Sequence, residues 1–292
     1  MPQRIDQSEK KPHLSMRTAL PVAMLLGSAL LIGCTQQNDG AADAFLPEAS
    51  ARTADGAIPD AKASDGAAPA IVSIENKTDA YDFSWSWPAV AESIPALAGH
   101  LKAEREQSLA NLAKDAESWK AEAEKNGFPF HSYSLQKDWE VVADTPQYLS
   151  LSAQAYTYTG GAHGMSYFDA LVWDRDAGKA LEPVAMFTSI DALDAAVRPA
   201  FCQLLDRQRV EKRGEPLSKD HSGMFEDCIT VKSTTVILGS ANRQKFDRIG
   251  FLIGPYEAGP YAEGSYEVTL PVTEAVMAAV KPEFQAAFTV PR

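Results

Sequence analysis

The stretch YTYTGGAHG, residues 156–164, joins two strand-like runs through a glycine-rich bend. Glycine adopts positive φ angles without steric cost, so three glycines in five residues favour a tight reversal between antiparallel strands. The bend also carries one of the five histidines of the chain. We therefore expect a β-hairpin here, with His163 at its tip.

Extended runs on both sides of the bend predict an antiparallel meander. Residues 132–143, 147–158 and 165–174 are strand-like, and residues 175–179 turn the chain once more. Upstream, residues 81–87 place an aromatic side chain at every odd position, which is the period of a half-buried strand. We expect these four rings to form the core face of a sheet; the alternative is an exposed platform that stacks on carbohydrate.

Helical periodicity separates these strands. Residues 89–126 carry an apolar stripe, and Gly127 ends the helix. Residues 189–213 form a second helix, in which Pro199 predicts a kink or two shorter helices. The first stripe consists of Ile94, Leu97, Leu101, Leu109, Leu112 and Trp119. The last part of the chain adds a hairpin at residues 231–254, a strand at 265–270 and a helix at 272–280.

These elements predict an α+β fold, an antiparallel sheet meander with helices packed on one side. Hydrophobic residues make up 45% of the chain and charged residues 23%, which is typical of a globular protein.

The charge balance restricts the class of partner. The formal net charge is −12, and without residues 1–34 the chain keeps 23 basic and 37 acidic side chains, a net −14. An acidic surface of this size argues against nucleic acid or anionic lipid as the main partner and suits a cationic one.

The N-terminus predicts an export signal. Residues 19–33 are uncharged, too short for a membrane span of about 20 residues but typical of a signal-peptide core. They end in LIGC, residues 31–34, which resembles the lipobox of bacterial lipoproteins. The resemblance implies cleavage before Cys34, lipidation of Cys34 and, with Thr35 next, sorting to the outer membrane of a Gram-negative bacterium, facing the periplasm. The alternatives to a lipoprotein signal are an ordinary secretory signal or an uncleaved anchor. Met16, in place of Met1, is an alternative start of the chain.

Residues 35–70 predict a disordered tether between the signal peptide, residues 1–34, and the folded body. They are rich in Ala, Asp, Gly, Pro and Ser. Such a segment cannot bury enough apolar surface to offset the entropy of ordering.

With Cys34 assigned to lipid, Cys202 and Cys228 remain as an even pair in an oxidising compartment, which favours a structural disulfide over free thiols or a redox pair. The two cysteines and the distant His221 do not make a zinc site. Asp174 begins a pattern similar to a calcium loop, but the remaining ligands are missing, so we expect a hairpin turn there. No metal site is predicted.

His163 is the candidate for chemistry. A catalytic histidine needs a nucleophile or an orienting carboxylate within hydrogen-bond reach. Ser166 and Asp169 follow along the same strand, and the common nucleophile, phosphate-loop and dinucleotide motifs are missing from the sequence. A structural or ligand-contact role is favoured, and no catalytic residue is assigned.

Residues 251–264, FLIGPYEAGPYAEG, predict a rigid loop that carries two tyrosines. Tyrosines set among Gly and Pro are typical of interfaces. The alternative, equally open, is that both pack inward with their hydroxyls bonded to backbone. We take Tyr256, Glu257 and Tyr261, together with His163, as candidate ligand contacts.

The motif YTYTGGAHG, the segment ALVWD that follows it and the late FLIGPYEAGPYA resemble the PdaC/RsiV-like extracytoplasmic domains of bacteria. The resemblance covers about residues 71–289, with a PdaC-like segment at 71–178 and an RsiV-like segment at 179–292. It implies an α+β architecture, in two successive segments that meet near Gly178 and can form one compact unit, and no known catalytic residues in these segments. No cofactor is predicted. The chain departs from the pattern at Gly259, where other members usually carry another residue.

The expected function is that of a periplasmic, lipid-anchored binding or sensing module without catalytic activity of its own. Members of the resembled family bind lysozyme, a basic protein, so the expected ligand is a cationic, lysozyme-like protein or a cell-envelope glycan such as peptidoglycan. The alternative is an enzyme that modifies envelope polysaccharide or peptidoglycan with His163 and carboxylates such as Glu257. Convergence of these two residues with Tyr256 in one pocket would separate the two hypotheses.

Overall fold

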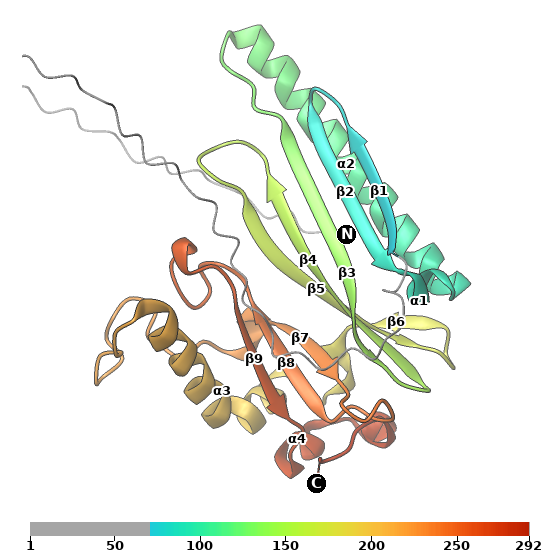
Figure 1. The fold of residues 1–292 in the computed structure, drawn as a ribbon, viewed down its shortest axis with the longest axis vertical. Coiled ribbons are helices and arrows are strands. Elements are labelled where there is room, and N and C mark those ends of the chain that lie inside the picture. Colours follow the sequence, from blue (N-terminus) through green and yellow to red (C-terminus); the bar gives the residue numbers. More distant parts are fainter. Residues whose placement is uncertain (1–70, 292) are drawn as a thin grey trace, which may run out of the picture. The chain divides into compact units, whose positions relative to one another are not determined.

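The structure, a computed structural model, describes residues 71–291. The predicted signal peptide with Cys34 and the predicted tether at residues 35–70 lie outside the described residues. Two β-sheets and their helices make up the described part, which confirms the α+β class (Figure 1). None of the described helices is long and apolar enough to cross a membrane.

The larger sheet has six strands in the order β1-β2-β3-β4-β5-β6. Strands β3 to β6 form the predicted antiparallel meander, but β2 and β3 are parallel, which the purely antiparallel prediction missed. The reason is that helices α1 and α2 connect β2 to β3, and a connection of this length carries the chain back to the start of a parallel neighbour. The elements are β1 (Ile71–Lys77), β2 (Tyr81–Pro88), α1 (Ala89–Glu92), α2 (Pro95–Asn126), β3 (Tyr133–Asp144), β4 (Tyr148–Tyr158), β5 (Met165–Asp174) and β6 (Lys179–Leu181).

The aromatic residues of β2 belong to the core. Tyr81, Phe83, Trp85 and Trp87 are all buried, and they pack with the apolar stripe of α2 in one cluster. The prediction of a core face is confirmed. These rings are therefore unavailable as an exposed carbohydrate platform.

Helix α2 follows most of its predicted stripe. Leu97, Leu101 and Leu112 are buried, and Gly127 ends the helix with a φ angle of 70°, as expected for a glycine cap. Trp119, however, is 46% exposed, so its assignment to the stripe was wrong. The buried positions near the C-terminal end of α2 are the small residues Ala116 and Ala123. The large indole of Trp119 is left outside the contact that these alanines make.

The short turn after β5 is the predicted hairpin turn. Asp174 Oδ1 accepts hydrogen bonds from the backbone N–H groups of Asp176 and Ala177 at 3.0 and 2.9 Å. The carboxylate that resembled the first ligand of a calcium loop therefore caps the turn.

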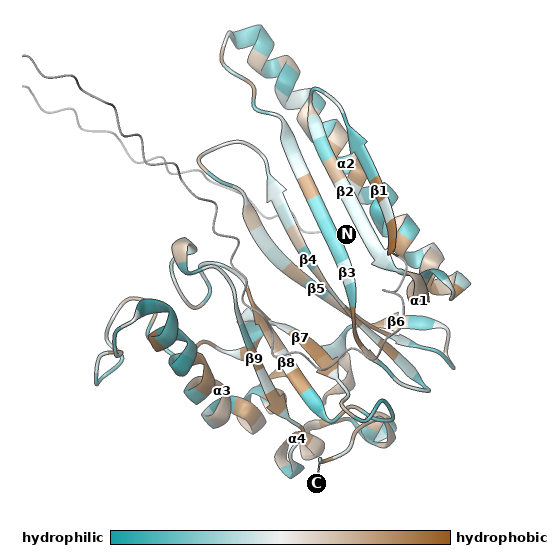
Figure 2. Cartoon of the chain, in the orientation of Figure 1, coloured by the Kyte–Doolittle hydropathy of each residue, from teal (hydrophilic) through white to brown (hydrophobic). Residues whose placement is uncertain are grey.

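The smaller sheet has three antiparallel strands in the order β7-β8-β9. Hydrophobic residues concentrate in these strands, and α3 turns hydrophilic towards its C-terminal end (Figure 2). The remaining elements are η1 (Pro183–Met186), α3 (Ile190–Arg213), η2 (Val231–Ser233), β7 (Thr235–Gly239), β8 (Arg248–Ile253), η3 (Tyr261–Glu263), β9 (Tyr266–Pro271), α4 (Glu274–Ala279) and η4 (Pro282–Ala287).

Helix α3 is continuous through Pro199. Of the two outcomes expected at this proline, a kink or two shorter helices, the second is excluded. Val197 and Phe201, on either side of the proline, are both buried in the core of the smaller sheet. This packing keeps both turns in one helix even though the proline donates no backbone hydrogen bond.

The two sheets share a core. Tyr148 and Val172 of the larger sheet belong to the apolar cluster formed by α3, α4 and the smaller sheet. The Thr235 hydroxyl on β7 also donates to the Phe168 carbonyl oxygen on β5 at 2.9 Å. Gly254, just after the end of β8, lies close to the Ser166 carbonyl oxygen near the start of β5.

Candidate functional site

The candidate site is built around the loop between β4 and β5. Six residues, 159–164, connect the two strands, and the last paired residues are Thr157 and Met165. Gly160 and Gly161 have φ angles of 95° and 96°, where other residues are strained. The predicted hairpin is confirmed, but its connection is longer than the tight reversal that the three glycines suggested.

Gly164 anchors this loop where β5 begins. It is buried, and a Cβ atom at this position would collide with the Tyr156 ring and lie 2.5 Å from the Thr157 carbonyl oxygen. Only glycine permits this approach. The contact between Tyr156 and Gly164 therefore holds the backbone next to His163.

The His163 imidazole has three neighbours. Nδ1 lies 2.8 Å from the Gly164 carbonyl oxygen, and Nε2 lies 3.4 Å from the Tyr256 hydroxyl. The Tyr261 ring stacks on the imidazole with a centroid distance of 3.9 Å and an interplanar angle of 22°. Because a carbonyl oxygen only accepts, Nδ1 donates to Gly164, and in this tautomer Nε2 accepts from the Tyr256 hydroxyl. We call His163, Tyr256 and Tyr261 the aromatic cluster.

Tyr256 is an exposed member of the aromatic cluster, as is His163. Its side chain is 45% exposed, its ring centroid lies 5.6 Å from that of Tyr261, and its φ angle is 72°. A bulky residue in the left-handed region costs free energy and persists only where the surroundings hold it. Of the two open alternatives for this loop, Tyr256 follows the exposed one, whereas Tyr261 is half-buried against the imidazole.

A groove of about 520 Å³ extends from the aromatic cluster along β5. Residues 165–168 form one wall, and residues 232–235, Leu252 and residues 254–257 form the other. Tyr256 lines it, and so does Glu257, whose carboxylate makes no hydrogen bond or ion pair with any described residue. We call this feature the edge groove.

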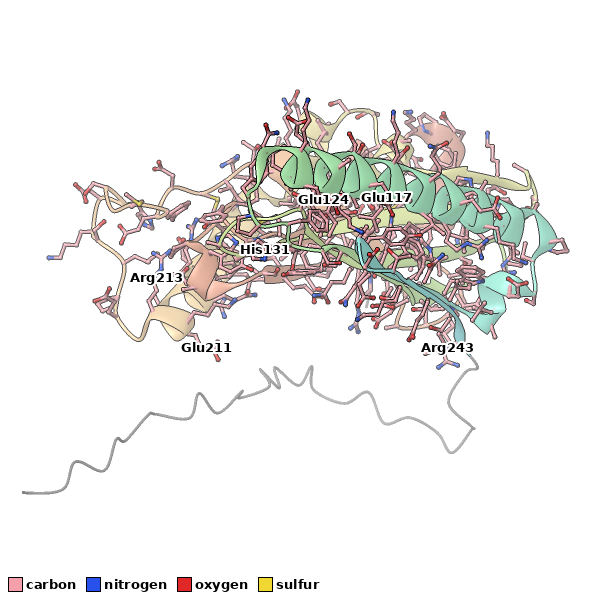
Figure 3. All side chains as sticks on the ribbon, turned by 90° about the horizontal axis from the view of Figure 1, so that it is seen from above. Glu117, Glu124, His131, Glu211, Arg213 and Arg243 are labelled. Atoms are coloured by element: carbon pink, nitrogen blue, oxygen red, sulfur yellow. A yellow bond between two sulfur atoms is a disulfide. The ribbon has the colours of Figure 1, made fainter. Side chains whose placement is uncertain are left out.

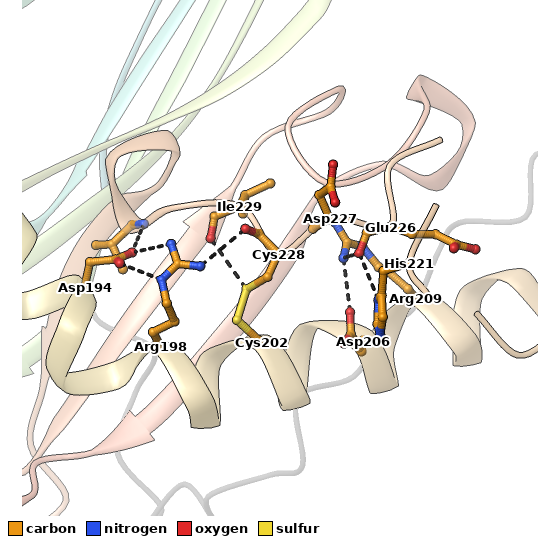
Figure 4. Close-up of a disulfide and its surroundings, with 11 residues drawn as sticks. Asp194, Arg198, Cys202, Asp206, Arg209, His221, Glu226, Asp227, Cys228 and Ile229 are labelled. Atoms are coloured by element: carbon orange, nitrogen blue, oxygen red, sulfur yellow. Dashed lines mark hydrogen bonds and ion pairs between the residues drawn. A yellow bond between two sulfur atoms is a disulfide. The ribbon is translucent and has the colours of Figure 1, made fainter. Parts of the chain in front are cut away.

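The segment between β8 and β9, residues 254–265, is held by Arg209, a fully buried residue of α3; we call this segment the tyrosine loop. Figure 4 shows Arg209 with Asp206, Glu226 and Asp227. Nε donates to the Ala258 carbonyl oxygen at 3.0 Å, and the other guanidinium nitrogens donate to the carbonyl oxygens of Glu226 and Asp227 at 3.1 and 2.9 Å. The predicted disulfide, Cys202 to Cys228, is present and closes the same region against α3. One guanidinium therefore ties the tyrosine loop to the disulfide-bonded loop.

Glu263 supports the loop from its other end. Arg213 donates to both carboxylate oxygens, at 2.9 and 3.2 Å, and the Tyr266 hydroxyl donates as well. Burial favours a higher pKa, but these donors hold the pKa of Glu263 below its ordinary value. Burial, followed by the bond to Glu263, raises the pKa of Tyr266 to about 12. A Cβ atom on Gly259 would collide with the Glu263 carboxylate, which explains the glycine at this departure from the family pattern.

The structure thus brings together three of the four predicted contacts. His163, Tyr256 and Tyr261 touch one another, whereas no bond joins the nearby Glu257 to His163. Within residues 71–291, no three His, Cys, Asp or Glu side chains are grouped so that they could hold a metal ion. Arg209 was missed, although a signal existed: it lies four residues after Leu205, on the apolar stripe of α3.

Comparison with known proteins gives a family match for part of the chain. Residues 74–166 match the family model described as Deacetylase PdaC. The match runs from β1 to the start of β5, so it includes His163 but ends before the tyrosine loop. A comparison with curated proteins finds no match.

Two solved structures are similar to the chain. A member of the DUF3298 family from Bacteroides fragilis NCTC 9343 is 19% identical, with 74% of this chain and 95% of that chain covered and a TM-score of 0.44. A DUF3298 family protein from Pseudomonas aeruginosa PAO1 is 15% identical, with 77% and 98% covered and a TM-score of 0.42.

The fold and the family match define the class: an α+β protein with a PdaC-like domain. Residues 74–166 are the part of the chain that is similar to this family. The assignment of residues 179–292 to an RsiV-like segment stays a prediction.

Proposed function

We propose that the chain is a lipid-anchored extracytoplasmic binding module that recognises a cationic protein, such as a lysozyme-like enzyme, through the aromatic cluster. The observation that carries the proposal is the contact of His163 with Tyr256, 93 residues further along the chain, and with Tyr261. Tyr256 also lines the edge groove. Aromatic side chains with one polar end are enriched at the centres of protein interfaces. A lipid on Cys34, at an outer membrane and facing the periplasm, is part of the same proposal.

The charge of the N-terminal segment, residues 71–178, supports a basic ligand. Residues 71–178 contain six lysines and two arginines against sixteen aspartates and glutamates. An excess of one sign attracts the oppositely charged partner and raises the rate of encounter. An anionic ligand would be repelled by the same surface.

The backbone of Tyr256 supports recognition as well. Its φ angle of 72° costs free energy that a glycine would avoid. Such strain concentrates at binding and catalytic sites. A tyrosine that is both strained and exposed is better explained by contact with a ligand than by the stability of the loop.

The contacts of His163 also support recognition. Its two nitrogens face the Gly164 carbonyl oxygen and the Tyr256 hydroxyl, and no carboxylate of the described residues bonds to the ring. A histidine base requires a nucleophile next to it and a group that orients it. No observation within residues 71–291 favours the envelope-modifying enzyme over the binding module.

The proposal is tested with the immobilised full-length protein, which is mixed at low salt with lysozyme and, separately, with peptidoglycan. We expect lysozyme to be retained, less so as salt screens the charges. Tyr256→Ala should weaken retention at least about tenfold, the size of a central aromatic contact. Met224→Ala, which removes a side chain that is 85% exposed on another loop, is the matched control.

Failure of the protein to retain lysozyme at low salt, or equal losses in both variants, would contradict the proposal. Retention of peptidoglycan without lysozyme would replace the protein ligand by a glycan. The anchor is tested separately: Cys34→Ser should abolish incorporation of radiolabelled palmitate, and continued labelling would refute lipidation at this residue.

A further inference from the structure

A second groove, of about 340 Å³, opens where the β4–β5 loop meets the C-terminal end of α2. Its lining includes Trp119, Phe128, His131, Tyr133 and residues 159–161. It shares no lining residue with the edge groove. We call this feature the loop groove.

Two large aromatic side chains of the loop groove are exposed to solvent. Trp119 is 46% and Phe128 39% exposed, and their ring centroids lie 5.6 Å apart at an angle of 44°. The other four tryptophans of the chain are all buried. An aromatic pair left in water gives up the free energy of its burial, and such exposed apolar groups mark interaction sites.

The backbone holds this aromatic pair in place. Helix α2 ends at Gly127, whose φ angle of 70° turns the chain back towards the helix. The Phe128 N–H then donates to the Ala123 carbonyl oxygen at 3.2 Å. Because the helix cap fixes Phe128 beside Trp119, a ligand would not have to order these rings, which reduces the entropic cost of binding.

Polar groups stand around the two rings. Burial and, after it, the Asp115 carboxylate raise the pKa of Tyr133. This tyrosine lines the groove and carries a hydroxyl that can donate a hydrogen bond. His131 lies beside the C-terminal half of α2, which carries Glu117 and Glu124 (Figure 3). Residues 159–161 add backbone groups of a loop in which two glycines have positive φ angles. Apolar faces and hydrogen-bonding groups thus line the same groove.

We propose that the loop groove binds a neutral pyranose ring of a glycan. A pyranose has an apolar face of C–H groups and a rim of hydroxyls, which matches aromatic faces bordered by hydrogen-bonding side chains. The volume is that of a small-ligand pocket, at the lower end of the usual range of about 300–1,000 Å³. The proposal is independent of the cationic-protein proposal because it involves neither His163 nor Tyr256.

Charge and area favour this ligand over others. The sixteen acidic and eight basic side chains of residues 71–178 oppose an anionic ligand such as a nucleotide or an acidic peptide. A stable protein interface buries about 800 Å² on each partner, far more than two aromatic side chains supply. A carbohydrate platform on β2 was the alternative to the core face that was predicted there; the exposed aromatic pair lies at the end of α2.

The test uses intrinsic fluorescence and calorimetry of the full-length protein with neutral tetrasaccharides: maltotetraose, cellotetraose and chitotetraose. Trp119 is the reporter because the other tryptophans are buried. We expect at least one tetrasaccharide, at about 1 mM, to shift the emission to shorter wavelength as the sugar displaces water. Trp119→Ala should weaken binding at least about tenfold, whereas Trp119→Phe, which keeps a ring, should retain most of it. Tyr256→Ala should bind sugar as the wild type does.

Three results would overturn the proposal. One is that no tetrasaccharide shifts the emission or gives heat; another is that Trp119→Ala, shown to be folded by circular dichroism, binds as tightly as the wild type. The third is an arginine-rich peptide that produces the shift when the sugars do not, which would assign the loop groove to a cationic segment.

Discussion

Replacement of Arg209 by methionine tests whether one guanidinium holds the tyrosine loop in place. Methionine keeps an unbranched side chain but donates no hydrogen bond. The wild-type side chain is fully buried and bonds the carbonyl oxygens of Ala258, Glu226 and Asp227 at 2.9–3.1 Å. The substitution therefore leaves three carbonyl acceptors without their charged donor.

The magnitude follows from these contacts. A hydrogen bond to a charged group contributes about 1.5–3 kcal/mol, and a buried acceptor left unsatisfied costs about 1–3 kcal/mol. The three losses are not additive, because they share one side chain and because water can reach the loops once they move. Removal of one partner from a buried charged network typically costs about 3–5 kcal/mol, which is our expectation for the free energy of unfolding. At about 2–4 °C per kcal/mol, the melting midpoint falls by roughly 6–20 °C.

The assay is equilibrium unfolding in urea, followed by tryptophan fluorescence and circular dichroism in non-reducing buffer so that the disulfide stays intact. Arg207→Met is the matched control: Arg207 is exposed on the same helix and makes no hydrogen bond or ion pair with a described residue. Its effect should stay within about 0.5 kcal/mol. An Arg209→Met effect below about 1 kcal/mol, or no larger than that of the control, would refute the role assigned to Arg209.

Three further outcomes are expected. Gly164→Ala should lower the free energy of unfolding by about 1–3 kcal/mol, because the added Cβ atom collides with Tyr156. Gly99→Ala is the control: this position in α2 has open space around it, so the change should be neutral or stabilising. Urea unfolding compares the two variants. Because the pKa of Glu263 is lowered in the folded state, its carboxylate stabilises the fold at pH values above the unfolded pKa near 4.5, and this stabilisation is lost as pH falls through the folded pKa. Glu263→Gln should therefore flatten the fall in melting midpoint below about pH 4.5. An unchanged acid profile would contradict this. Tyr256→Gly should relieve the backbone strain and leave the melting midpoint unchanged or higher while lysozyme retention falls; a less stable variant that still retains lysozyme would show a structural role instead.

Local patterns predicted most elements of the fold. The strict alternation in residues 81–87 predicted both the strand and the burial of its aromatic face, because period two follows from the backbone alone. Pairing between strands was harder to predict. β2 and β3 are separated by α1 and α2, and nothing local to either strand specifies that they are parallel neighbours.

Lys137 is a single residue whose contacts the local sequence pattern does not predict. It lies on the apolar face of β3, 3% exposed, with its ammonium 5.0 and 4.8 Å from the ring centroids of Trp85 and Trp139. Burial lowers the pKa of a lysine, but the Asp169 and Glu104 carboxylates hold the pKa of Lys137 above its usual value. One partner comes from α2 and the other from β5, so the alternation of β3 by itself predicts an apolar residue at this position.

The aromatic cluster could be predicted only as separate pieces. The motif at residues 156–164 indicated a loop with His163, and the motif at residues 251–264 indicated a loop with two tyrosines. The contact between these loops depends on how the end of β8 meets the start of β5. The PdaC-like match, residues 74–166, contains the histidine and neither tyrosine. A ligand that touches the whole cluster must therefore contact both halves of the chain at once, and affinity at this site becomes a measure of how the two halves are held together. Arg209 and the disulfide, which position the tyrosine half, would then control binding without touching the ligand.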